Sequence, residues 1–72
     1  MEKIDWDKPI QATFGDGTVI KAFTIGENEM GDMWVGIPDP SDVDKTTGKM
    51  ILVNKYGRSV HTGMRLIENV LL

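Results

Sequence analysis

The chain has 72 residues, a formal net charge of −3 and no cysteine, which allows one domain with a small core. Without cysteine there is neither a disulfide nor a thiolate metal site, and the single His61 cannot build an imidazole site by itself. Overall acidity also argues against non-specific nucleic-acid binding, which needs a basic surface.

The first predicted elements form a hairpin. Lys8-Pro9 favours extended backbone, and apolar side chains then alternate with others along residues 10–14. Gly15-Asp16-Gly17 supplies residues that tolerate a positive φ angle, and residues 18–25 after it are rich in β-branched side chains. We therefore expect two antiparallel strands joined by a tight turn between Phe14 and Thr18.

The middle of the chain predicts a third strand followed by the longest loop. Residues 26–32 are an acidic turn, and residues 33–37 place Trp34 on the face opposite three aliphatic side chains. Residues 38–49 form the loop. Its aspartates do not have the spacing of an EF-hand, so they are interpreted as turn residues: Asp39, Asp42 and Asp44.

The last third of the chain predicts further short strands. Residues 50–56 have strand character, and Tyr56-Gly57-Arg58 is expected to turn into a short strand over residues 58–60. Residues 65–72 fit a strand, with a short helix as the alternative. The expected fold is all-β, a small SH3-like barrel or curved antiparallel sheet of roughly five or six strands. Its interior would be filled by side chains, so a ligand would lie on the surface or between subunits.

The aromatic residues divide into core and surface candidates. Phe14 and Phe23 are expected in the core, and Trp6 is expected to pack the N-terminal arm onto the sheet. Trp34 has two interpretations. It either caps a second small core or stays on the surface, where exposed tryptophan is typical of interfaces.

Charge is distributed in two blocks of opposite sign. Residues 26–44 contain six acids and no base, whereas residues 45–67 contain five bases and no acid. One interpretation is chance clustering of solvated side chains. The other is a dipolar molecule that offers a basic patch to an anion or stacks head to tail with its own kind.

The basic block contains the candidate binding site. Guanidinium groups bind phosphate and aromatic rings stack on bases, so basic residues around a tyrosine could hold a phosphate or a nucleotide. The alternative is an ordinary hairpin with a polar outer face. Together with the tryptophan of the third strand, the candidate binding residues are Trp34, Tyr56, Arg58, His61 and Arg65.

Catalysis is not expected. His61 and Ser59 invite comparison with a hydrolase, but neither Ser41 nor Ser59 lies in a nucleophile-elbow sequence. The sequence therefore predicts no enzyme, no catalytic residue, no metal site and no cofactor.

Both ends of the chain resemble a known group of proteins. Residues 4–10, with Asp5-Trp6-Asp7-Lys8-Pro9 at their centre, and the following Gly15-Asp16-Gly17 resemble the opening of small uncharacterised β proteins of bacteriophages and prophages. Tyr56-Gly57-Arg58 and residues 66–70 are similar to their later hairpin and last strand. The resemblance leaves out residues 26–49, where the long loop departs from it. It implies a viral setting and no catalytic residues.

These observations lead to two hypotheses of function. The first is a phage-type accessory protein that binds and inhibits a host protein, or binds another phage protein, and that forms a homo-oligomer because no disulfide stabilises so short a chain. The second is an oligomer that traps an anionic small molecule such as a nucleotide between subunits. With neither a signal peptide nor a spanning segment in the sequence, we expect it in the cytoplasm of a bacterial host.

Overall fold

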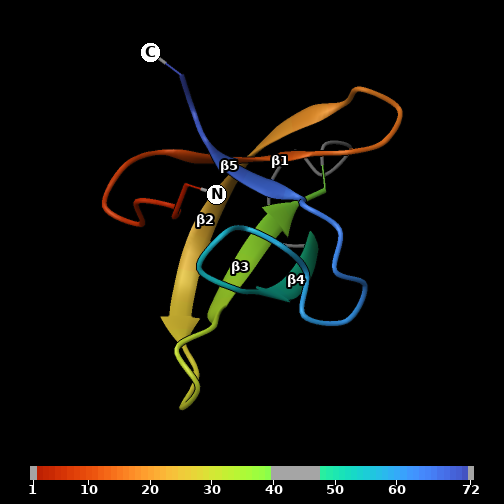
Figure 1. Ribbon diagram of the computed structural model, residues 1–72. Coiled ribbons are helices and arrows are strands. Elements are labelled where there is room, and N and C mark those ends of the chain that lie inside the picture. The colour runs from red at the N-terminus through yellow and green to blue at the C-terminus, as the bar shows by residue number, and fades with distance from the viewer. Residues whose placement is uncertain (1, 40–47, 72) are drawn as a thin grey trace.

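The computed structural model describes residues 2–39 and 48–71. It contains five strands and, within those residues, no helix (Figure 1). No helix of the described part is therefore long and apolar enough to cross a membrane. The strands are β1 (Ile10–Thr13), β2 (Val19–Glu27), β3 (Met33–Pro38), β4 (Gly48–Val53) and β5 (Ile67–Asn69). The all-β prediction is confirmed.

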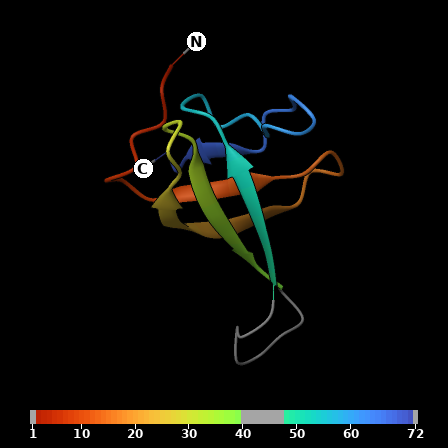
Figure 2. The ribbon, with the colours of Figure 1, turned by 90° about the horizontal axis from the view of Figure 1, so that it is seen from below.

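The five strands form one antiparallel sheet in the order β4-β3-β2-β1-β5. Strands β1 to β4 follow one another as a meander, and β5 returns to pair with β1. Among residues 2–39 and 48–71 no ladder joins β4 to β5, so the sheet is open and curved rather than a closed barrel. Figure 2 shows β3 and β4 running steeply across the direction of β1 and β2.

Strand β2 produces the curvature because its two halves have different neighbours. Residues 19–22 pair with β1, whereas residues 23–27 pair with β3. The second ladder shifts register between Thr24 and Gly26. A bulge of this kind adds a residue and increases local twist, so the strand bends and the sheet can wrap around a core.

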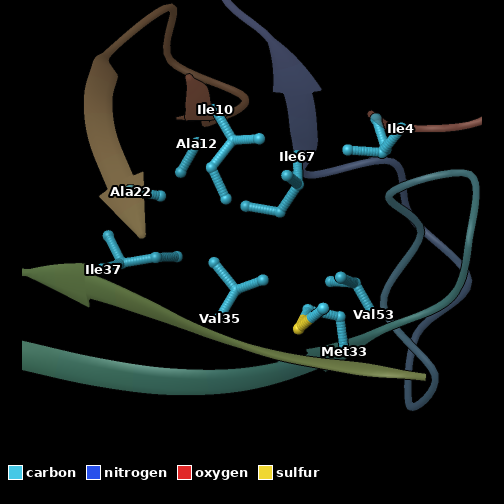
Figure 3. Packing of buried hydrophobic residues seen from close by; sticks show 9 residues of the cluster. All are labelled: Ile4, Ile10, Ala12, Ala22, Met33, Val35, Ile37, Val53 and Ile67. Carbon is cyan, nitrogen blue, oxygen red and sulfur yellow. The ribbon is translucent and has the colours of Figure 1, made fainter. Parts of the chain in front are cut away.

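The core lies between the two halves of the curved sheet. Side chains of β3 point inward at every second position, as the alternation predicts. In Figure 3, Val35 of β3 points toward Ile10 of β1 and Ile67 of β5. The buried cluster comprises Ile4, Ile10, Ala12, Ala22, Met33, Val35, Ile37, Val53 and Ile67. Trp6 packs against it, as expected, while Phe14, which was expected within the core, packs against it at partial burial.

The prediction that Phe23 belongs to the core is wrong. Its side chain is 54% exposed and lies on the outer surface of the sheet. Ala22 takes the inward position of β2, and the next residue of a strand must point to the opposite face. The Phe23 ring instead covers Gly36 of β3, where an added Cβ would lie 2.5 Å from the ring atom Cε2.

Tight turns of one pattern follow β1, β2 and β4. In Phe14–Thr18, Asn28–Asp32 and Asn54–Arg58, the first residue donates its N–H to the carbonyl of the fifth residue. The fourth residue, a glycine in each turn, donates to the carbonyl of the first. This is a type I turn closed by a left-handed residue, a common hairpin connection. The predicted Phe14–Thr18 hairpin is confirmed.

The chain after β4 differs from the sequence-based expectation. Residues 58–60 do not form a strand. Arg58 and Ser59 make isolated bridges to Arg65 and Val53, because the chain turns again at once between Ser59 and Gly63. The last element is a strand, as favoured over a helix, and is only three residues long. Most of the expected loop, with Asp42 and Asp44, lies outside the described residues.

The N-terminal arm is fastened to the C-terminal part of the chain. The Ile4 amide donates to the Lys55 carbonyl at 2.8 Å, and the Ile4 side chain is buried. The Asp5 amide donates to Asn69 Oδ1 at 2.8 Å, and Asn69 Nδ2 donates back to the Asp5 carbonyl at 2.8 Å. These bonds place the arm beside the turn of residues 54–58.

Candidate functional site

Three of the candidate binding residues lie around one small pocket. Tyr56, Arg58 and Arg65 line a hollow of about 180 Å³ together with Glu2 of the N-terminal arm. We call this hollow, defined by those four residues, the basic pocket. The other two candidates lie elsewhere, since His61 is exposed in the turn after Ser59 and Trp34 is on β3.

The two arginines of the basic pocket occupy facing positions. Arg58 and Arg65 form an isolated antiparallel bridge. Arg58 Nη1 donates to the Gly63 carbonyl at 2.9 Å, which fixes its guanidinium beside the turn. Arg58 Nε is buried and has no hydrogen-bond partner among the described residues. Beside the arginines, Lys55 Nζ lies 5.3 Å from the centroid of the Tyr56 ring.

The positive charge of the basic pocket is not neutralised by a contact ion pair. No acid of residues 2–39 and 48–71 lies within 4.0 Å of either guanidinium. Arg65 also interacts electrostatically with Glu68, whose carboxylate accepts hydrogen bonds from Gln11 and Thr13. These bonds, first from Gln11 and then from Thr13, lower the pKa of Glu68, and the charge of Arg65 contributes least. Like charges directly opposite each other destabilise a sheet.

Ser59 and His61 are arranged as parts of a turn. Ser59 Oγ accepts the backbone N–H groups of His61 and Thr62, both at 3.3 Å. The Ser59 side chain is buried, while His61 is exposed. The His61 backbone amide, and not its imidazole, therefore bonds to the Ser59 hydroxyl, and this bond stabilises the turn.

A second surface lies on the outside of the sheet. Residues that face each other across an antiparallel ladder share a face. Phe23, Gly36 and Met50 form one such row across β2, β3 and β4, and Trp34 faces Leu52 in the next row. Phe23 and Met50 are 54% and 59% exposed, whereas Trp34 and Leu52 are half-buried. We call Phe23, Trp34, Met50 and Leu52 the outer face.

Acidic residues lie near one end of the outer face, and one of its edges is open. Glu27, the last residue of β2, and Glu29, in the turn before β3, are both exposed. Glu27 pairs with the inward-facing Met33, so it lies on the opposite side of the sheet from Trp34. At the edge, the Leu52 carbonyl accepts the Val60 amide on the side away from β3. In an antiparallel strand, residues two positions apart point their N–H and C=O groups to the same side, so those of Met50 also point away from β3. No backbone group of the described residues bonds to Met50 on that side.

Another hollow, larger than the basic pocket, is mainly apolar. It has a volume of about 390 Å³ and is lined by Phe14, Ile20, Ile37, Pro38, Asp39, Gly48 and Lys49. Ile37 on its wall belongs to the core, Phe14 and Ile20 pack against the core, and its charged lining residues are Asp39 and Lys49. We therefore interpret it as the open end of the curved sheet rather than as a site with convergent polar groups.

Sequence reasoning missed several residues of these surfaces. Period-two alternation links Trp34 to the outer side of β3, but pairing register is needed to add Phe23, Met50 and Leu52. Glu2 reaches the basic pocket through contacts of the arm with distant residues. No family model, curated protein or solved structure matches the chain. Function is therefore inferred from the two surfaces.

Proposed function

We propose that the chain is a phage-type accessory protein that binds a host protein through its outer face and inhibits it without catalysis. The observation that carries the proposal is the exposure of Phe23 and Met50 beside the half-buried Trp34 and Leu52. Aromatic residues and methionine are enriched at protein interfaces, and tryptophan often supplies much of the binding energy. Exposed apolar side chains gathered on one sheet face are typical of such a surface.

The expected partner surface has an apolar ridge flanked by lysine or arginine. The apolar ridge would cover Phe23 and Met50, and the basic flank would meet the exposed Glu29 in the turn between β2 and β3. Complementary charge of this kind speeds association and excludes partners of the wrong sign. The open edge at Met50 can also bond the backbone of an extended partner segment.

The non-catalytic part of the proposal is supported by the arrangement of Ser59 and His61. Ser59 Oγ is occupied by backbone amides and buried, so it is not presented to a substrate. A nucleophile needs a base within hydrogen-bond reach in a cleft. At Ser59 Oγ the His61 residue places its backbone N–H, which donates a hydrogen bond and cannot act as a base.

We infer the phage-type role and the bacterial cytoplasm from the resemblance of residues 4–10 and 15–17 to small phage and prophage proteins. Homo-oligomerisation rests on the short chain and the absence of cysteine. The alternative hypothesis, a protein that traps whole nucleotides, is less well supported because the basic pocket is small. Its volume of about 180 Å³ is below the roughly 300–1,000 Å³ of typical small-molecule sites.

A pull-down from bacterial lysate with matched variants tests the proposal. The outer-face variant replaces Phe23 and Met50 by serine, and the control replaces Met30 and Met64, which are 86% and 58% exposed elsewhere. We expect a bound host protein to be retained by the wild type and the control, and lost by the outer-face variant. Thermal unfolding of all three proteins checks that each is folded.

Two results would contradict the proposal. Recovery of the same proteins by the outer-face variant and the wild type would place the interface elsewhere. Light scattering that shows a dimer for the wild type, a monomer for the outer-face variant and no host protein lost would assign this face to a second copy of the chain.

A further inference from the structure

We propose that the basic pocket binds the phosphate group of a phosphomonoester. The site uses Tyr56, Arg58 and Arg65, none of which belongs to the outer face. It therefore goes beyond the proposed function and stands or falls independently of it.

Charge is the first argument. Arg58 and Arg65 face each other across an antiparallel bridge without a contact ion pair to any acid of the described residues. Facing like charges are unfavourable unless an anion lies between them. A phosphomonoester carries about −1.5 to −2 at neutral pH, which matches two guanidinium groups better than the single charge of a carboxylate does.

Geometry is the second argument. Arg58 uses one guanidinium N–H for the Gly63 carbonyl, so its position is fixed before any ligand arrives. Each guanidinium has five N–H donors. Arg58 Nε is buried, so the donors left for a ligand are the other free N–H groups of Arg58 and those of the exposed Arg65. Held donors bind an oxyanion better than mobile ones because less conformational entropy is lost on binding.

Size and the remaining wall define the ligand more closely. A hollow of about 180 Å³ accommodates a phosphate group but not an attached base and ribose. The phosphate can come from a small metabolite or from a phosphorylated side chain, since both present the same group. Glu2 also lines the pocket, and its carboxylate repels a phosphate, so removing that charge should strengthen binding.

Calorimetric titration with inorganic phosphate at constant ionic strength tests the site. The main variant is Arg65→Gln, because Arg65 is exposed and its side chain makes no hydrogen bond to another residue of the described ranges. Its matched control is Lys49→Gln, which removes the same charge at the other end of β4. We expect Arg65→Gln to raise Kd roughly tenfold or more, as loss of a charged hydrogen bond does. Lys49→Gln should leave Kd unchanged, and Glu2→Gln should lower it.

Arg58→Lys separates the fork geometry from charge alone. It keeps the positive charge but loses paired donors, so phosphate binding should weaken even where thermal unfolding is unchanged. If this variant does not fold, the comparison of Arg65→Gln with Lys49→Gln still decides the question.

The proposal is overturned if phosphate does not saturate the wild type, or if Arg65→Gln and Lys49→Gln change Kd equally. Phosphoserine and adenosine monophosphate distinguish the source of the group. Affinities within a few-fold of that of inorganic phosphate would support recognition of the phosphate alone. Adenosine monophosphate binding more than tenfold tighter than both others would show that the base is bound and would overturn it.

Discussion

The turns at residues 14–18 and 54–58 have the same backbone hydrogen bonds but different surroundings. Each has a glycine with positive φ at its fourth position, 89° for Gly17 and 78° for Gly57. A Cβ added to Gly17 would meet no atom within 4 Å. A Cβ added to Gly57 would collide with the Ile67 carbonyl oxygen and approach Ile4 Cδ1 to 3.2 Å. The same local turn is thus a surface connection in one place and a packing junction in the other.

The largest expected effect is at the two glycines. Gly57→Ala combines the cost of a positive φ, about 1–3 kcal/mol, with a collision against backbone that cannot move aside easily. We expect it to destabilise by roughly 3 kcal/mol or more and to unfold much of the population. Gly17→Ala meets only the conformational cost, about 1 kcal/mol. Urea unfolding of both variants measures the difference in the free energy of unfolding. Equal decreases for the two variants would show that the close contacts around Gly57 do not add to the destabilisation.

A smaller effect is expected at the side chains that brace the turns. Asn54 Oδ1 accepts the amides of Tyr56 and Arg58 at 2.9 and 3.1 Å in a partly buried turn. Asp16 Oδ1 accepts one amide, that of Thr18, at an exposed site. Asn54→Ala should therefore cost about 1 kcal/mol or more, and Asp16→Ala less. Asn28→Ala, which also removes an acceptor of two amides, is the intermediate case in the same unfolding experiment.

The smallest expected effect is a dependence on pH that the turn at residues 14–18 should show and the turn at residues 54–58 should not. The hydrogen bond from the Thr18 amide is the main cause that lowers the pKa of Asp16 below its ordinary value of 3.8. A lowered pKa means that the ionised form stabilises the folded state at neutral pH, and that this contribution is lost as pH falls through the folded-state pKa. The Thr18 amide resonance should follow that titration, and Asp16→Asn should abolish it. The Tyr56 amide, bonded to a non-titrating asparagine, should not show it.

Sequence reasoning succeeded where the decisive interactions are local. Gly15-Asp16-Gly17 predicted the hairpin because the turn depends on backbone conformation within a few residues. The prediction for Phe23 was wrong because alternation shows which residues share a face and not which face is buried. Ala22 occupies the inward position, and only the packing of β2 against β1 and β3 decides that choice.

The candidate site could be predicted only in part for a related reason. Arg58 and Arg65 come together because the chain folds back between Ser59 and Gly63. A single glycine at position 63 does not by itself reveal that turn. Glu2 joins them through bonds of the arm to residues more than fifty positions away. His61 is close to the arginines in sequence but is exposed at the turn, so proximity along the chain did not place it in the pocket.

The fastening of the N-terminal arm to the last strand has a consequence for synthesis on the ribosome. Ile10 and Ala12 of β1 lie opposite residues of β5, and Asp5 bonds to Asn69. Strand β1 can pair with β2 early, but the arm and β1 lack their partners in β5 until residues 67–69 have been made. A ribosome-bound chain stalled before residue 67 should remain sensitive to proteases. Stable folding should occur only after β5 has left the ribosomal exit tunnel.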